Sequence, residues 1–96
     1  TGPDDLASHI CRYWAPDARK ALEQEVFDLY FDRLMERGVE GYGRKLAWKD
    51  YRLGVVEQFY KRAWRGRYAN WDDEGFWISQ NVIEAYHDLR CDELLG

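Results

Sequence analysis

The sequence contains little proline, which interrupts helices, and little cysteine, which can cross-link a chain. Its 96 residues include two prolines and two cysteines. No apolar run approaches the roughly 18 residues that cross a membrane, and the sequence has no signal-peptide pattern. Apolar residues make up 46% and charged residues 33%, which is typical of a globular protein rather than a disordered one. The composition predicts one soluble helical domain over residues 1–96, with no membrane association.

The two cysteines lie near opposite ends of the chain, at Cys11 and Cys91. Together with His9 and His87 they do not form the closely spaced set of four ligands of a structural zinc site, and we expect no metal. Two buried thiols in a reducing compartment are favoured, and this predicts a cytoplasmic location. A disulfide that joins the two ends is the alternative.

Charge is distributed unevenly along the chain. The formal net charge is −4, which provides no general attraction to nucleic acid or anionic lipid. Residues 44–67, however, carry eight basic side chains against two acidic ones. The simplest interpretation is a basic helix whose charge is complemented by acidic helices of the same domain.

Spacing and capping residues predict four helices, at about 4–14, 17–37, 44–65 and 73–90. Pro3 suits the start of the first helix, and Pro16 separates the first from the second. Gly38 is typical of a left-handed C-terminal cap, and Gly54 indicates close packing of another helix. The predicted fold class is all-α, with the helices in a small orthogonal or bundle-like array and a short tail at 91–96 that can fray.

The helix expected at 17–37 carries two neighbouring apolar lines, which together form an unusually broad arc. Such an arc predicts contacts on more than one side of the helix. One line is formed by Leu22, Val26, Leu29 or Tyr30, and Leu34, and the other by Phe27, Phe31 and Met35.

Several short patterns have both a functional and a structural interpretation. Ser8 and His9 are adjacent, and adjacent helical residues point in different directions, so a nucleophile–base pair is not favoured. The carboxylates of 72–74 could recruit Mg²⁺, but an acidic first helical turn explains them equally well. The basic residues around Trp64, at 61–67, could contact phosphates, but the net charge and the following acidic stretch argue against nucleic-acid binding.

Aromatic residues are abundant, with five Trp, seven Tyr and four Phe. Trp64, Trp71 and Trp77 fall around the expected loop before the last helix. Rings beside carboxylates can enclose a cationic or sugar-like molecule, whereas packing between helices is the more ordinary role. Packing is favoured here, and the chain shows no catalytic constellation.

The order of several motifs resembles the C-terminal helical part of the aminoglycoside phosphotransferase and choline/ecdysteroid-kinase-like superfamily, which has a protein-kinase-like fold. The resemblance covers roughly residues 2–65. It is carried by Gly2-Pro3-Asp4-Asp5-Leu6-Ala7, Trp14-Ala15-Pro16-Asp17, Gly38-Val39, Gly41-Tyr42 and Ala47-Trp48-Lys49-Asp50-Tyr51-Arg52-Leu53.

This resemblance implies a scaffold that walls the acceptor site of a small-molecule kinase. The nucleotide-binding lobe, catalytic loop and metal-binding Asp of that family have no counterpart here, so ATP and Mg²⁺ would belong only to a complete parent protein and the isolated chain would not catalyse. Asp5 would have a structural role. The positions expected nearest a small-molecule acceptor are Trp48, Asp50, Tyr51 and Arg52.

A second function from a different class stays open. The broad apolar arcs of the second and third helices would suit a self-standing protein-interaction module that could form a homodimer. The partners expected are therefore a second copy of the chain or, under the resemblance, a missing N-terminal kinase lobe.

Overall fold

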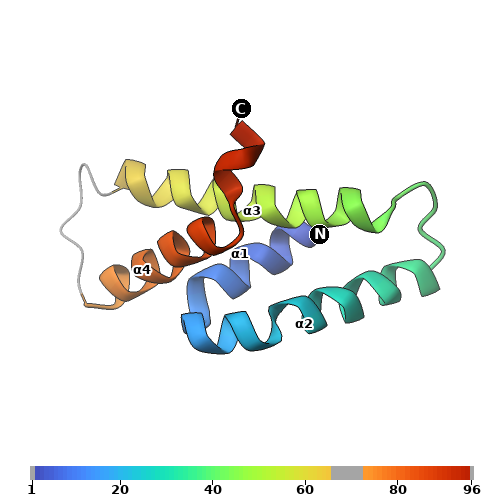
Figure 1. Cartoon of the computed structure of the whole chain (residues 1–96), viewed down its shortest axis with the longest axis horizontal. Coiled ribbons are helices and arrows are strands. Elements are labelled where there is room, and N and C mark those ends of the chain that lie inside the picture. The colour runs from blue at the N-terminus through green and yellow to red at the C-terminus, as the bar shows by residue number, and fades with distance from the viewer. Residues whose placement is uncertain (1, 66–72, 96) are drawn as a thin grey trace.

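The computed structural model describes residues 2–65 and 73–95, and all of its regular elements are helical (Figure 1). The α-helices are α1 (Pro3–Tyr13), α2 (Pro16–Glu36), α3 (Arg44–Arg65) and α4 (Asp73–Asp88). A short 3-10 helix, η1, follows at Cys91–Leu95. The predicted all-α class and the number of helices are confirmed, and no described helix is long and apolar enough to cross a membrane.

The helix boundaries follow from local signals. Pro3 and Pro16 each occupy the first position of a helix, where the missing N–H is not needed. At the end of α2, Gly38 has a φ of 84°, Val39 N–H donates to Leu34 O, and Gly38 N–H donates to Met35 O. This is the Schellman arrangement, so the predicted cap at Gly38 is confirmed.

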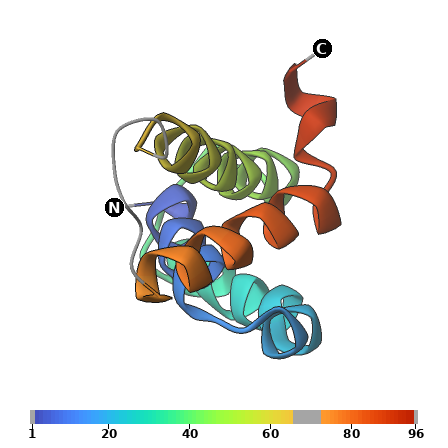
Figure 2. The ribbon, with the colours of Figure 1, turned by 90° about the vertical axis from the view of Figure 1, so that its left-hand side faces the viewer.

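The three long helices run back and forth along the molecule, whose principal extents are 45 × 28 × 21 Å. In Figure 1, α2 and α3 run antiparallel at the lower and upper sides, and α4 returns antiparallel to α3. The shorter α1 lies between them and packs most extensively on α3; Figure 2 shows it with α3 above, α2 below and α4 to one side. α1 is therefore the centre of the array.

Gly54 of α3 allows α1 to approach closely, as the sequence predicted. A Cβ atom at this position would lie 2.7 Å from the carbonyl oxygen of Asp4 and 3.1 Å from Cβ of Ala7. Any side chain would therefore push the two helices apart. The described core is contributed by every element: Ala7, Ile10, Cys11, Phe27, Phe31, Ala47, Tyr51, Val55, Val56, Val82, Ala85 and Cys91.

The tail is more ordered than the sequence suggested. Cys91 in η1 is fully buried, and Leu94 packs against the core. Cys11 is also fully buried, and both cysteines are free thiols, so two buried thiols are confirmed and the alternative disulfide is not formed. Burial raises the pKa of Cys11 to about 12 and that of Cys91 to about 11.

The two apolar lines of α2 have different surroundings. Phe27 and Phe31 are buried in the core, with Met35 packed against it. In the other line, Leu22 is 46% exposed and Leu29 is 60% exposed, whereas Val26 packs against the core. At Leu22 and Leu29, the contacts predicted on a second side of this helix are thus not supplied by the described residues of the chain itself.

Candidate functional site

The four residues expected nearest a ligand lie along α3 and diverge in space. Trp48 and Arg52 line a groove between α2 and α3. Tyr51, which lies between these two residues in the sequence, is fully buried. Asp50 points to a different side, where it accepts a hydrogen bond from the hydroxyl of Tyr42. The four residues therefore do not form one site. Trp48 and Arg52 line the groove, Tyr51 belongs to the core, and Asp50 contacts Tyr42 elsewhere.

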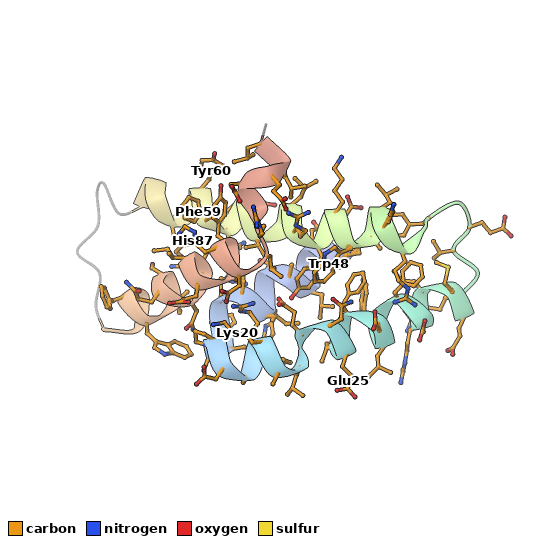
Figure 3. The ribbon with its side chains drawn as sticks, viewed as in Figure 1. Lys20, Glu25, Trp48, Phe59, Tyr60 and His87 are labelled. Atoms are coloured by element: carbon orange, nitrogen blue, oxygen red, sulfur yellow. The ribbon has the colours of Figure 1, made fainter. Side chains whose placement is uncertain are left out.

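The groove between α2 and α3 has a volume of about 680 Å³, which is within the range of small-molecule sites. Its apolar surface comes from Phe27, Leu46 and Trp48. Figure 3 shows Trp48 between the ribbons of α3 and α2. The polar side chains that line the groove are predominantly cationic: Arg44, Lys45, Lys49 and Arg52, with Gln24 as the neutral member.

Two aromatic rings, Phe27 and Trp48, line this groove, and the ring of Tyr51 is buried behind them. Trp48 stacks on Tyr51 with ring centroids 5.0 Å apart and planes at 7°. Phe27 stands nearly perpendicular to both, with centroid separations of 4.9 Å to Trp48 and 5.7 Å to Tyr51. Because Phe27 is close to both rings, it lies beside the Trp48–Tyr51 stack and not on the outer face of the indole.

A buried polar network lies behind the aromatic rings. Arg19 is 1% exposed and donates from Nη1 to Oε1 of Glu23 at 2.9 Å, while its Nη2 pairs with Asp88. Tyr51 donates its hydroxyl proton to Oε2 of Glu23 at 2.6 Å. The network joins α2, α3 and α4 through charge-assisted hydrogen bonds.

Burial is the main influence on the acid–base chemistry of this network. It raises the pKa of Glu23, while the hydrogen bond from Tyr51 and the charge of Arg19 oppose that rise. It also raises the pKa of Tyr51, so this phenol remains protonated and acts as a donor. Sequence reasoning missed Arg19, Glu23 and Asp88, because charged residues on α2 and α4 resemble an ordinary solvated helix face.

Arg52 connects the groove to the C-terminal end of the chain. Its Nε donates to the carbonyl of Leu89 at 2.9 Å, and its Nη2 donates to Arg90 O at 2.5 Å and to Glu93 Oε1 at 3.0 Å. The guanidinium therefore holds the segment between α4 and η1 against α3. Its main contacts in the described chain are structural.

The remaining candidate residues do not form a chemical centre. Ser8 accepts a hydrogen bond from Gln58 at 2.7 Å, whereas the His9 ring lies 5.2 Å from Tyr13, so the two neighbours face different groups. Asp5 is exposed in the first turn of α1. Among the described residues, no group of three or more His, Cys, Asp or Glu side chains could hold a metal.

Some of the patterns singled out in the sequence lie outside the described residues. This applies to Arg67, Trp71 and Asp72. For Trp64, Arg65, Asp73 and Glu74 the structure describes the helical backbone but not the side chains. Of the expected tryptophan cluster, Trp77 is described and is 45% exposed on α4.

Comparison with known proteins gives limited similarity. No family model matches the chain, and no solved structure matches it. A leucyl/phenylalanyl-tRNA–protein transferase from Citrobacter koseri is 32% identical over 81 residues, which cover 81% of this chain and 29% of the transferase. The chain thus spans less than a third of the length of the curated relative that it matches.

These comparisons overturn the family resemblance drawn from the sequence. The relative that matches is an aminoacyl-tRNA–protein transferase, and no kinase-like family model matches. The resemblance to aminoglycoside phosphotransferases and choline/ecdysteroid kinases was wrong. It depended on short motifs built from Gly, Pro, Trp and Asp, residues that also recur at helix ends and helix contacts for general structural reasons.

Proposed function

We propose that this chain is a helical protein-interaction module that associates with a second copy of itself through α2. The observation that supports this proposal is the exposed apolar line on the outer side of that helix. Leu22 is 46% exposed and Leu29 is 60% exposed, although both belong to an amphipathic pattern that normally faces a partner.

A groove beside this line extends the apolar surface onto α1. It has a volume of about 560 Å³ and lies along α1, α2 and the segment that follows α2. Val39, at its end, is 39% exposed. The lining is mainly apolar: Leu6, Val26, Leu29, Tyr30, Arg33, Leu34, Arg37 and Val39. A partner helix placed here would cover leucine side chains and the aliphatic stems of two arginines.

The charges that flank the line favour a second copy of the chain as the partner. Glu25 and Arg33 lie on α2 at equal distances in sequence on either side of Leu29. Both side chains are exposed, and Figure 3 shows Glu25 projecting away from the rest of the molecule. In the described part of the chain neither one forms an ion pair.

A two-fold axis near Leu29 would make these charges complementary. Two antiparallel copies of α2 would then place Glu25 of each copy opposite Arg33 of the other, around a central pair of Leu29 side chains. The 21 residues of α2 extend about 31 Å. That length is sufficient for a self-complementary interface with an apolar centre and a charged rim.

The matching transferase does not provide a better assignment. Its name states that it acts on leucyl- or phenylalanyl-tRNA and a protein, but the matching stretch makes up 29% of that enzyme. We therefore do not extend its activity to this chain.

Size-exclusion chromatography with light scattering on the full chain tests the proposal. A concentration-dependent approach to twice the chain mass of 11.5 kDa is expected. Leu29→Asp should weaken association at least about tenfold, because it places a charge at the centre of the apolar contact. Leu95→Asp is a matched control, since Leu95 is 50% exposed on η1, and it should leave association unchanged.

A charge exchange tests the geometry of the pairing. Glu25→Arg and Arg33→Glu should each weaken the dimer, because each places like charges opposite one another. The double variant Glu25→Arg/Arg33→Glu should restore association. A strictly monomeric chain at about 100 µM, or a dimer that Leu29→Asp leaves intact, would reject the proposal.

A further inference from the structure

The groove between α2 and α3 has a chemistry unlike that of the proposed dimer surface, and the two share no lining residue. We propose that this groove binds a small anion that carries a planar aromatic ring, of the nucleoside-phosphate class. The proposal does not depend on dimer formation, because the groove lies on the inner side of α2 and the exposed leucine line lies on the outer side.

The aromatic wall supplies a surface for a planar ring. One face of the Trp48 indole is covered by Tyr51. The distances from the Phe27 ring to both of these rings place Phe27 beside the stack. Trp48 is half-buried and lines the groove, so its outer face is the surface on which a ligand ring could stack. The two neighbouring rings hold the indole in place, which reduces the entropy lost when a ligand binds.

The cations of the groove differ in how far they are already engaged. Arg44 donates to Asp28 at 2.6 Å and to Asp32 at 3.1 Å, and Arg52 is bonded to the C-terminal segment. Lys45 and Lys49 are exposed, and neither takes part in a hydrogen bond or ion pair with the described residues. These two ammonium groups are therefore free to receive an anion.

The spacing of the two lysines also favours an anion. They lie one helical turn apart on α3, where like charges repel and destabilise a helix slightly. A phosphate between them would replace this repulsion with attraction and would accept hydrogen bonds from both ammonium groups. The positive charge is local, since the chain as a whole carries −4.

The dimensions and lining of the groove favour a small ligand. A volume of about 680 Å³ accommodates a base, a sugar and a phosphate, and the apolar residues Phe27, Leu46 and Trp48 lie beside the cationic ones. A purely inorganic anion would leave the aromatic wall unused, and a neutral aromatic compound would leave the lysines unpaired. A ligand with both parts would use both features.

Isothermal titration calorimetry of the full chain with AMP tests the inference. Saturable binding with a dissociation constant below about 1 mM is expected. Adenosine and inorganic phosphate, each of which supplies one half of the ligand, should bind at least about tenfold more weakly. The tryptophan fluorescence of the chain should change with AMP, and Trp48→Leu should remove most of the binding.

A pair of double variants tests the role of the two lysines. Lys45→Gln/Lys49→Gln should weaken AMP binding about tenfold, since each exposed charge contributes modestly. The matched control is Lys20→Gln/Lys61→Gln, which removes the same charge from two exposed lysines outside the groove. The control should stay within twofold of the wild-type affinity.

Three results would overturn the inference. The first is the absence of saturable AMP binding at about 10 mM. The second is an equal loss in the two double variants, which would indicate a general charge effect. The third is tight binding of a short single-stranded RNA with none of AMP, which would assign the basic surface to a polymer. Because the four lysines lie at exposed positions, the thermal melts of the two lysine double variants should match the wild type, and a folding defect would be visible directly.

Discussion

The hydroxyl of Tyr51 donates a 2.6 Å hydrogen bond to Glu23, and both residues are almost completely excluded from solvent. This contact joins α3 to α2 at a point where the two helices otherwise make few contacts. Glu23 also accepts a hydrogen bond from Nη1 of Arg19 at 2.9 Å, so two side chains donate to this one buried carboxylate. The network therefore specifies how α2 is placed against the other helices.

Replacing Tyr51 by phenylalanine should destabilise the fold by about 1–3 kcal/mol, because one oxygen of Glu23 would keep its burial and lose a donor. Chemical denaturation monitored by circular dichroism measures the effect. Tyr60→Phe is the matched control, since Tyr60 is 54% exposed on the same helix, and it should change stability by less than about 0.5 kcal/mol. Equal effects of the two substitutions would show that the buried hydroxyl has no special role.

The raised pKa of Glu23 predicts a defined pH dependence. Burial makes the folded state hold the Glu23 proton to a higher pH than the unfolded state, whose pKa is near the ordinary 4.5. The contribution of this group to stability is therefore greatest below pH 4.5 and is lost as the pH rises through the folded pKa.

Comparison with Glu23→Gln isolates this contribution, because every other carboxyl group is shared by the two proteins. The unfolding free energy of the wild type should fall relative to that of Glu23→Gln as the pH rises from about 4 toward neutrality. Denaturant melts at several pH values provide the measurement. A difference that stays constant, or that changes in the opposite direction, would contradict the raised pKa.

The sequence predicted the elements of this fold better than it predicted their interactions. Helix boundaries depend on Pro16 and Gly38, which act on the adjacent backbone and are visible locally. The burial of Arg19 depends on Asp88, which is 69 positions away, and no local pattern reports such a pairing. The prediction for Gly54 succeeded because a glycine inside a long helix has few explanations other than a close approach.

The candidate site was predicted less well, for a related reason. Trp48, Asp50, Tyr51 and Arg52 are close in sequence, but positions two apart on a helix point in different directions. Asp50 therefore contacts Tyr42, while Trp48 and Arg52 line the groove. The two lysines of the groove were counted in the basic segment, yet only the path of α2 shows that they lie beside an aromatic wall.

Substitution of Gly54 by alanine should destabilise the protein by about 1–3 kcal/mol. Alanine has a better helix propensity, but its Cβ would lie 2.7 Å and 2.8 Å from backbone atoms of Asp4, which cannot rotate away. Gly43→Ala is the control, because no atom lies within 4 Å of a Cβ at that position and its backbone is not left-handed. Thermal denaturation should separate the two variants, and a Gly54→Ala protein at least as stable as the wild type would refute the close approach of α1.

The buried thiols should be unreactive until the protein opens. Burial raises the pKa of Cys11 to about 12 and that of Cys91 to about 11, so very little thiolate is present near pH 8. An aromatic disulfide reagent should modify both thiols slowly in native protein and rapidly in denaturant. Because both pKa values are raised, stability should also decline as the pH rises from about 9 toward 11. Immediate native modification of either thiol would show that its part of the core is accessible.

Arg52 bonds the segment that leads into η1, so we expect it to help keep Cys91 buried. Its side chain is 16% exposed and bonds to the carbonyls of Leu89 and Arg90, and Arg90 itself has a φ of 52°. Lysine keeps the charge but lacks the planar fork that reaches several acceptors. Arg52→Lys should therefore accelerate amide exchange at Cys91–Leu95 by about tenfold and expose Cys91 to thiol reagents, while Cys11 stays protected. The matched control is Arg44→Lys at an exposed ion pair, and it should alter neither property. Equal protection of Cys91 in Arg52→Lys would mean that core packing alone retains η1.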